Sequence, residues 1–339
     1  MRYYIPVFLL LFACQNASVK EQSSEKLVTE ASPNETFLKS WESSERKSQL
    51  MTFVTNITNT EHSQYIATQD RIAVFDNDGT LWSEKPVYFQ LYFTFYRLKQ
   101  LVAQHPEWKQ QSPYKELLAG DYAAALHSGE EALIQLLMDT HAGMDSKTFQ
   151  QLVRTWLKEE QHPEKKVPFT DLVYQPMLEM IDYLHHHDFR VFIVSGGGLE
   201  FMRAWATDVY DIPSERIIGS TVKTTYDYNN GQPHIYREAE LEFIDDKAGK
   251  PVNIHKIIGK HPVLCFGNSD GDLEMMQWTE AHPIASMMVY IHHTDSVREW
   301  AYDRNSAVGK FDKALDEAKR KGWLLVDMKE DWKQVYAFE

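Results

Sequence analysis

The sequence predicts an α/β fold in which a mostly parallel sheet carries helices on both faces. Short, unbroken apolar runs such as Ile72–Phe75 are typical of strands that are buried on both sides. These runs alternate with segments of helical periodicity, and three of them end in clusters of polar residues and glycine. Strands that alternate with helices form parallel sheets, whose functional groups gather beyond the carboxyl ends of the strands.

The expected elements follow in chain order from changes in the apolar period. After the first strand, about a hundred residues of helical period interrupt the strands, and we expect them to form a separate helical unit. The predicted elements are a strand at 72–75, helices at 87–102, 129–143 and 145–160, a helix at 176–185, a strand at 189–198, a hairpin at 216–244 with an Asn-Gly turn, a helix at 251–258, and strands at 262–272 and 283–291, followed by a charged amphipathic stretch at 313–322.

The N-terminal residues predict export. A positive end with Arg2 is followed by an apolar run that is too short to span a bilayer and by Cys14. The ending resembles a bacterial lipobox, so we expect residues 1–13 to be a signal peptide and Cys14 to be lipidated, which would anchor the protein on the periplasmic side of the cell envelope. Phe12 departs from the small residue usual at that place, and cleavage elsewhere is the alternative.

The expected domain boundaries follow from these patterns. Residues 14–40 are rich in Ser, Glu, Asn and Lys and predict a flexible tether. Residues 41–86 and 175–339 are assigned to the α/β core, and residues 87–174 to the inserted helical unit.

Composition limits the partners of the protein. Acidic residues outnumber basic ones by 49 to 35, the formal net charge is −14, and no basic run is interleaved with aromatic residues. Nucleic acid is therefore excluded as an expected partner. The only other cysteine, Cys265, lies in an apolar run, so a lipidated Cys14 leaves no disulfide within the chain.

Two aspartates follow the first strand at the polar strand end DNDGT. Asp76 and Asp78 would repel each other unless a divalent cation lies between them, and hard oxygen ligands without clustered Cys or His favour Mg²⁺. A solvated Asp/Gly turn is the alternative for this motif alone. At the second strand end, the hydroxyl of Ser195 and the N–H groups of Gly196 and Gly197 are suited to bind phosphate oxygens, although a simple turn has the same pattern.

Four ordered motifs carry a family resemblance over residues 70–295. The sequences DNDGT, IVSGGG with Ser195, GKPVNIHKI with Lys250, and GNSDGD resemble the motifs of the haloacid dehalogenase superfamily, especially its phosphoserine phosphatase-like branch. The resemblance implies a Rossmann-like core with a mobile cap. It also implies Mg²⁺-dependent hydrolysis of a small phosphorylated metabolite through an aspartyl-phosphate. The second aspartate, which dehalogenating members lack, favours phosphate ester hydrolysis.

The resemblance implies a role for each motif residue. Asp76 would be the nucleophile, and Asp78 would act as general acid and then general base while its main-chain carbonyl contacts the metal. Ser195 would donate a hydrogen bond to a phosphoryl oxygen, and Lys250 would balance the charge on the phosphoryl group and on Asp76. Lys247 and Lys256 precede the same strand, and they are the alternatives to Lys250.

The last motif departs from the family pattern. Asn268 stands where members usually have aspartate, so the implied metal ligands are Asp76, Asp78, Asn268 and Asp272, and Asp270 is an alternative to Asp272.

Glu84, at the start of the cap, is expected to contact substrate. It falls one place from the substrate-sensing glutamate of phosphoserine phosphatases, which leaves serine specificity open. A solvated hinge is the alternative role for Glu84. Two other functions remain possible for the chain: a phosphotransferase of the same fold, and a catalytically weak envelope binding protein in which Asn268 marks the loss of the metal site.

Overall fold

A computed structural model describes residues 37–339 of the chain. The predicted signal peptide, Cys14 and the tether up to residue 36 lie outside the described residues. The last residues assigned to the tether pack against the core. Leu38 is fully buried, and both the backbone N–H and the Oγ of Ser40 donate to Glu179 over 2.8 Å. The ordered core thus includes residues before position 41.

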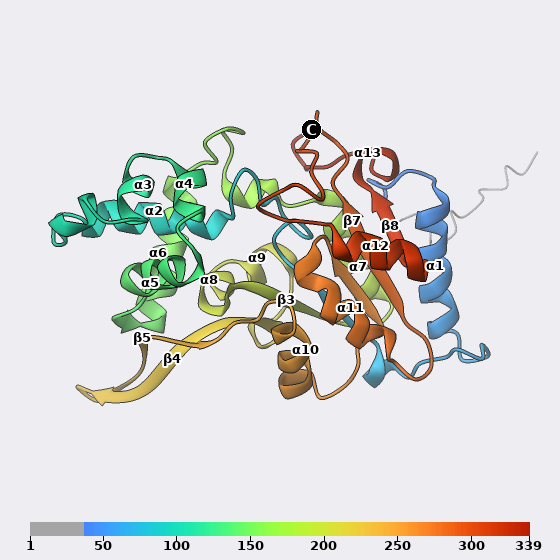
Figure 1. The fold of residues 1–339 in the computed structure, drawn as a ribbon. Helices are drawn as coiled ribbons and strands as arrows, with labels where there is room; N and C mark the ends of the chain where they lie inside the picture. The colour runs from blue at the N-terminus through green and yellow to red at the C-terminus, as the bar shows by residue number, and fades with distance from the viewer. Residues whose placement is uncertain (1–36) are drawn as a thin grey trace, which may run out of the picture.

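The centre of the fold is an eight-stranded sheet in the order β2-β5-β4-β3-β1-β6-β7-β8 (Figure 1). The six neighbouring strands β4, β3, β1, β6, β7 and β8 all pair in parallel. Strand β5 pairs antiparallel with both β4 and β2. The mostly parallel sheet is therefore confirmed. The strands are β1 (Ile72–Phe75), β2 (Met144–Asp145), β3 (Arg190–Gly198), β4 (Ile217–Asn229), β5 (Gln232–Phe243), β6 (Leu264–Gly267), β7 (Met287–His292) and β8 (Leu324–Asp327).

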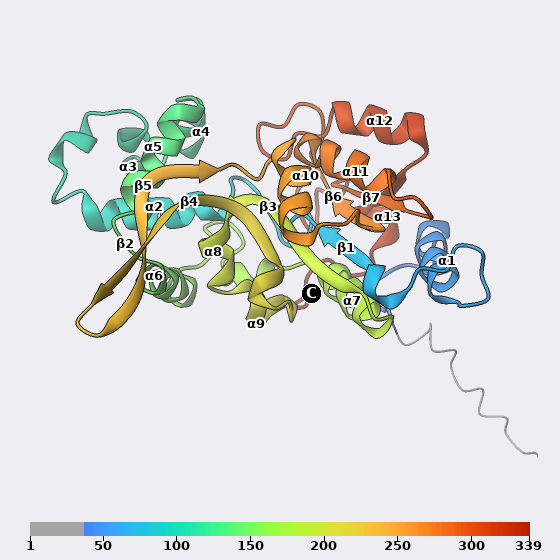
Figure 2. The same ribbon diagram turned by 90° about the horizontal axis from the view of Figure 1, so that it is seen from below.

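Helices cover both faces of the sheet because successive side chains of a buried strand point to opposite sides. Ala73 and Phe75 of β1 pack in one hydrophobic cluster, and Ile72 and Val74 pack in the other. Figure 2 shows α10, α11 and α12 on one side of β1 and α7 on the other. The core helices are α1 (Glu45–Thr58), α7 (Gln175–His186), α8 (Leu199–Arg203), α9 (Ala206–Tyr210), α10 (Gly249–Asn253), α11 (Leu273–Glu280), α12 (Lys313–Lys321) and α13 (Met328–Asp331).

The cap is inserted between β1 and β3, as the sequence predicts. Its helices are held together by aromatic packing: Phe93 contacts Phe149, Trp156 and the core residue Phe201, with ring centroids 5.5–5.7 Å apart. The cap helices are α2 (Phe89–Leu101), α3 (Tyr114–Leu118), α4 (Tyr122–Leu126), α5 (Glu130–His141) and α6 (Ser146–Glu159).

The β4–β5 hairpin joins the core to the cap. Its turn has Asn230 and Gly231 at φ values of 51° and 76°, which is the left-handed pair that the Asn-Gly signal favours. The hairpin runs from the core sheet along the cap, where Arg237 of β5 pairs with Met144 of β2 (Figure 1). One wall of the cap region is thus a two-stranded arm, which the sequence assigned to the core.

Within residues 37–339, no helix is both long enough and apolar enough to cross a membrane.

Candidate active site

Three neighbouring parallel strands bring the polar motifs to one edge of the sheet. In the order β3-β1-β6, Phe75 of β1 pairs with Ile193 of β3 and with Phe266 of β6. The residues that follow these positions therefore emerge at the same level, and they include Asp76 and Asn268. The structure thus unites the strand ends that the sequence singles out.

Lys250 of α10 contacts two carboxylates at this edge. Its Nζ lies 2.6 Å from Oδ1 of Asp76 and 2.6 Å from Oδ1 of Asp272, and its side chain is only 2% exposed. The alternative lysines lie elsewhere: the side chain of Lys247 is 70% exposed, and Nζ of Lys256 lies over the ring of Phe243. Of the three lysines, Lys250 is the one that the fold places beside Asp76.

Burial sets the electrostatics of this cluster. Desolvation, reinforced by the charge of Asp272, raises the pKa of Asp76 well above its usual value, while Lys250 acts in the opposite direction. The two carboxylates raise the pKa of Lys250 well above its ordinary value, although burial opposes this change. When both carboxyl groups are ionised, two carboxylates and one ammonium leave a net negative charge, and a bound cation would favour that ionised state of Asp76.

Asp78 lines the same cavity as Asp76, and its charge acts on Asp76. Its Oδ1 accepts a 2.7 Å hydrogen bond from Nε1 of Trp82, and burial raises its pKa to about 6. Gly79 follows with φ of +73°, and a Cβ there would lie 2.0 Å from Nδ2 of Asn268. Only glycine permits both this backbone conformation and the close approach of the first motif to the last.

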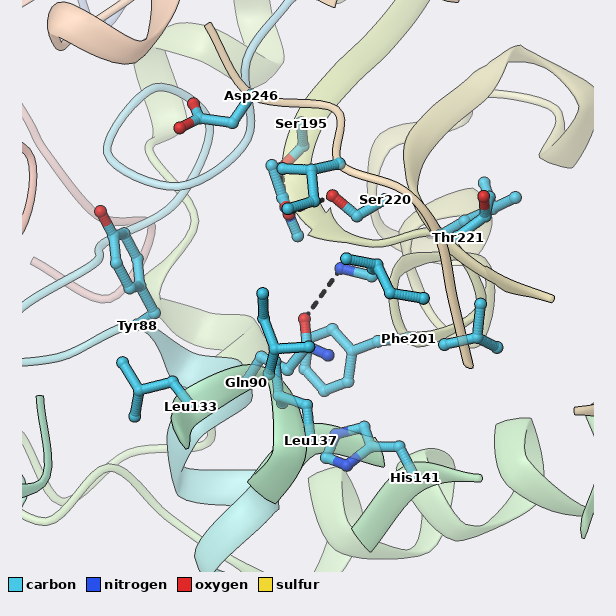
Figure 3. Close-up of a pocket in the computed structure, with 18 of the residues that line it drawn as sticks. Tyr88, Gln90, Leu133, Leu137, His141, Ser195, Phe201, Ser220, Thr221 and Asp246 are labelled. Carbon is cyan, nitrogen blue, oxygen red and sulfur yellow. Dashed lines mark hydrogen bonds between the residues drawn. The ribbon is translucent and has the colours of Figure 1, made fainter. Parts of the chain in front are cut away.

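The glycines after Ser195 differ in part from the expected phosphate cradle. The N–H of Gly197 donates to Oγ of Ser195 over 3.1 Å, and the N–H of Gly198 donates to Oε1 of Gln90 over 2.9 Å (Figure 3). These two donors are therefore bonded within the protein. Gln90 belongs to α2, so this contact also ties the cap to the strand end. Oγ of Ser220 donates to the carbonyl of Gly196 over 2.8 Å.

The two aspartates of the last motif, Asp270 and Asp272, have different partners. Oδ2 of Asp272 accepts the N–H groups of Asn268 and Ser269 over 3.0 and 3.1 Å, while its Oδ1 contacts Lys250. Asp270 is directed away from the cluster, because its Oδ1 accepts the N–H groups of Asp312 and Ala314, each over 2.9 Å, at the start of α12. Asp270 is thus a structural capping residue.

Glu84 is joined to the metal motif. Its side chain is buried, and Oε1 accepts a 2.7 Å hydrogen bond from Nδ2 of Asn268 and a 2.8 Å hydrogen bond from the hydroxyl of Tyr302. Burial raises the pKa of Glu84 well above its usual value. The solvated hinge is therefore wrong for Glu84. The sequence contained no signal for Tyr302, which lies 218 positions away.

The donors at these strand ends fit a hard cation. No group of three or more His, Cys, Asp and Glu side chains suited to a metal occurs in residues 37–339. The available set instead mixes the carboxylate of Asp76, the carbonyl of Asp78 and the amide oxygen of Asn268, which accepts only a 3.3 Å hydrogen bond from Oγ1 of Thr80 among the described residues. Oxygen ligands of this kind suit Mg²⁺ rather than Zn²⁺.

A cavity of about 1080 Å³ opens above the cluster, between the core and the cap. Asp76, Asp78, Ser195 and Lys250 line one end of it. Figure 3 shows Ser195, Ser220 and Asp246 at that end and Leu137 and His141 at the other, with Phe201 between them. Much of its wall is apolar and comes from α5, α8 and the arm: Leu133, Ile134, Leu137, Phe201, Val222 and Leu241.

Comparison with known proteins identifies the family of this chain. Residues 73–277 match the family model described as haloacid dehalogenase-like hydrolase. A conserved protein of unknown function from Anaerococcus prevotii has a similar crystal structure, with a TM-score of 0.52, 15% identity, and coverage of 84% of this chain and 92% of that one. At this identity, the likeness concerns the fold. No protein with a curated description matches the sequence.

Two weaker structural likenesses carry no argument about function. A phosphoserine phosphohydrolase-like protein from Francisella tularensis has a TM-score of 0.35 and 16% identity, and the match covers 65% of this chain and 87% of that one. A probable phosphoserine phosphatase from Vibrio cholerae has a TM-score of 0.37 and 14% identity, with coverage of 73% and 64%.

Proposed function

Because this chain belongs to the haloacid dehalogenase-like hydrolase family, we propose that it is a Mg²⁺-dependent phosphomonoesterase that acts through an aspartyl-phosphate. The observation that carries the proposal is the position of Lys250. Its Nζ contacts Oδ1 of Asp76 over 2.6 Å, so that Oδ2 is the oxygen we assign to nucleophilic attack. Asp272 holds the other side of the ammonium group.

Two half-reactions follow from the proposed roles. In the first, Oδ2 of Asp76 bonds to phosphorus, the bond to the ester oxygen breaks, and Asp78 gives its proton to the leaving alcohol. In the second, Asp78 takes a proton from water, the water oxygen bonds to phosphorus, and the bond to Asp76 breaks. Inorganic phosphate leaves, and both carboxyl groups return to their starting states. A pKa of about 6 allows Asp78 to serve in both steps.

Ser195 and Lys250 would stabilise the charge on the transferring group. We propose that the hydroxyl of Ser195, with N–H groups of the following glycines that remain available, donates to phosphoryl oxygens, while Lys250 offsets negative charge. The carboxylate of Asp76, the carbonyl of Asp78 and the amide oxygen of Asn268 would hold Mg²⁺. When bound, Mg²⁺ supplies positive charge that offsets the carboxylates and the phosphoryl oxygens.

Asp272 and Glu84 receive supporting roles. Both oxygens of Asp272 are engaged by Lys250 and by backbone N–H groups, so we propose that Asp272 positions Lys250 and the last motif rather than ligating the metal directly. Glu84 accepts the amide of Asn268, so we propose that it orients the Asn268 oxygen toward the metal rather than contacting substrate.

The test combines turnover with trapping of the covalent intermediate. Phosphate release from p-nitrophenyl phosphate by the full chain is expected to require Mg²⁺ and to be abolished in Asp76→Asn. In Asp78→Asn, the good leaving group still departs, but the second step lacks its base, so a phosphoryl group should accumulate on Asp76. Mass spectrometry of the acid-quenched protein would locate it. Turnover by Asp76→Asn at the wild-type rate would contradict the mechanism.

We also propose that the protein is an exported lipoprotein. The support is the sequence of residues 1–14 alone, with Arg2, the apolar run and Cys14. Labelled fatty acid fed to a bacterial host should be incorporated into the wild-type chain and not into Cys14→Ala. Equal incorporation in both would contradict the anchor.

A further inference from the structure

Arg237 on β5 is a buried arginine that forms no ion pair with any side chain that the structure describes. Its side chain is 5% exposed. Nε donates to the carbonyl of His141 over 3.0 Å, and Cζ lies 4.1 Å from the ring centroid of Phe149. A guanidinium group that is removed from water without an anionic partner carries a large desolvation cost. Burial lowers the pKa of Arg237 to about 10 accordingly.

Glu200 is the one carboxylate whose charge acts on Arg237, and its oxygens contact other side chains. Glu200 raises the pKa of Arg237 through its charge, yet it accepts a 2.5 Å hydrogen bond from Gln150 and lies 3.8 Å from Nη1 of Arg203. The Nη groups of Arg237 make no hydrogen bond within the part of the chain that the structure describes. Up to four N–H donors of Arg237 are therefore free to bind a ligand.

Arg237 lines the same cavity as Asp76 and Lys250, but it lies far from these two residues. In the hairpin, Arg237 pairs with Thr224, which lies four residues along β4 from Ser220. Ser220 contacts Gly196 at the end where we place the phosphoryl group. At about 3.3 Å per residue, these two levels of the arm are about 13 Å apart. Between them the cavity is lined by apolar side chains, including Phe201 and Leu241.

We infer that Arg237 binds a carboxylate at the far end of the substrate, and that the substrate is a phosphate ester of an elongated, largely apolar molecule. The inference rests on the proposed phosphatase function. The carboxylate of phosphoserine is separated from phosphorus by only a few bonds, too few to reach Arg237 while the phosphoryl group is at Asp76. A cavity of about 1080 Å³ also lies just above the range of about 300 to 1,000 Å³ that is typical of pockets for drug-sized ligands.

The geometry of the guanidinium favours a carboxylate among anions. Phe149 covers one face of the planar group and His141 occupies Nε, so the Nη edge is the part that remains. Two parallel N–H groups at such an edge match the two oxygens of a carboxylate. A terminal phosphate shares the negative charge, and the experiment therefore includes it.

The experiment compares three matched series of phosphate esters with chains of about 6 to 12 carbon atoms. One series ends in methyl, one in carboxylate and one in a second phosphate. In the wild type, at the chain length that reaches Arg237, kcat/KM should be about tenfold higher for the carboxylate series than for the methyl series. The difference should come from a lower KM, with kcat little changed. This advantage should disappear in Arg237→Met and be partly kept in Arg237→Lys.

Arg97 provides the matched control. It is 8% exposed and donates to the carbonyl of Thr140 and to Oε1 of Gln100, but it does not belong to the cavity lining. Arg97→Met loses a buried cation of the cap and should keep the ratio between the carboxylate and methyl series. Loss of the ratio in this variant would indicate a general effect on cap structure and would overturn the inference.

Binding to Asp76→Asn separates the failure of the inference from the failure of the proposed function. Calorimetry should show tighter binding of the carboxylate series than of the methyl series, whether or not the wild type hydrolyses either. Equal binding would overturn the carboxylate site, and stronger binding of the bisphosphate series would overturn the assignment to a carboxylate. Absence of hydrolysis together with a carboxylate preference would contradict only the phosphatase proposal.

Discussion

Asn268 donates its side-chain amide to the carboxylate of Glu84 over 2.7 Å, and both side chains are buried. This contact accounts for the amide at a position where the family usually carries aspartate. A second carboxylate at position 268 would lie against Glu84, so one of the two groups would have to hold a proton or repel the other. The uncharged side chain of Asn268 therefore fits its surroundings in this chain.

Asn268→Asp is expected to weaken the protein rather than improve it. The new carboxylate would lie within contact of Glu84, and two buried like charges at such a distance repel strongly. We expect the free energy of unfolding without metal to fall by about 2 kcal/mol at pH 8. Urea unfolding in the presence of a chelator measures this. A variant as stable as the wild type would contradict the assigned contact.

The double variant Asn268→Asp with Glu84→Gln restores one carboxylate and one amide with their positions exchanged. It should recover most of the lost stability and bind Mg²⁺ more tightly than either single variant, as measured by calorimetry. Glu84→Gln alone should weaken Mg²⁺ binding by about tenfold, because the amide oxygen of Gln accepts the N–H of Asn268 more weakly than a carboxylate does and so fixes the Asn268 oxygen less firmly. Additive effects of the two substitutions would argue against direct coupling.

Lys250→Met removes the ammonium group that lies between Asp76 and Asp272. Breaking a buried ion pair from one side costs about 3 to 5 kcal/mol, since the remaining charges stay buried without a partner. The pKa of Asp76 is already raised, so the folded protein takes up a proton there as the pH falls. The deficit in unfolding free energy should therefore be largest at pH 8 and smaller at pH 5.

The control for this comparison is Lys247→Met. The side chain of Lys247 is 70% exposed, and its loss should change the unfolding free energy by less than about 0.5 kcal/mol at either pH. Equal effects at positions 247 and 250 would contradict a buried charge cluster at the strand ends.

Asp78 predicts a pH profile that depends on the leaving group. The general acid must carry a proton, and burial raises its pKa to about 6, so the protonated fraction falls as the pH rises above that value. For esters of ordinary alcohols, kcat/KM should decline above about pH 6. For p-nitrophenyl phosphate, whose leaving group needs no proton, the decline should be weaker. Identical profiles for both substrates would contradict the role of Asp78.

Trp82 provides an internal check on this assignment. Its Nε1 donates to Oδ1 of Asp78 over 2.7 Å and lowers the pKa of that carboxyl group. In Trp82→Phe this stabilisation of the charged form is lost, and the declining limb should move to higher pH. Because Trp82 is fully buried and stacks on Trp205, the thermal stability of the variant is measured alongside.

Local sequence signals predicted those parts of the fold that depend on local physics. The apolar run Ile72–Phe75 is buried on both faces in the structure, and the left-handed pair Asn230 and Gly231 makes the hairpin turn. The length and reach of the arm were not predictable, because they depend on the pairing of β5 with the two-residue strand β2 across the cap. A strand of two residues is too short to show an alternating pattern, so the sequence does not predict that pairing.

Only those parts of the site that lie in short continuous motifs could be predicted from the sequence. Asp76, Ser195 and Asn268 follow apolar strands, and this placement is visible in the sequence. The choice of Lys250 among three lysines, by contrast, depends on where the chain from position 247 to position 256 passes the strand ends, which places only Lys250 beside Asp76. The partners of Glu84 and the burial of Arg237 arise from contacts across the whole fold, which no local pattern encodes.

Asp245 predicts a pH-dependent stability that is independent of catalysis. Its side chain is fully buried, and burial raises its pKa from an ordinary value of 3.8 to about 7, although Lys250 and Asn253 act in the opposite direction. The folded state therefore holds a proton that the unfolded chain has already released above pH 4. The contribution of Asp245 to stability is full below pH 4 and is lost as the pH rises to about 7.

Asp245→Asn removes this titration while it keeps the size of the side chain. Each unit of pKa shift corresponds to about 1.4 kcal/mol, so a rise from 3.8 to about 7 predicts that the variant gains on the order of 4 kcal/mol of unfolding free energy at pH 8 and nothing at pH 4. Urea unfolding at the two pH values measures the difference. Asp246→Asn is the neighbouring control, because the side chain of Asp246 is 40% exposed and its neutralisation should change the unfolding free energy by less than about 0.5 kcal/mol. A gain for Asp245→Asn that is equal at both pH values would show that the buried carboxyl group does not titrate between them.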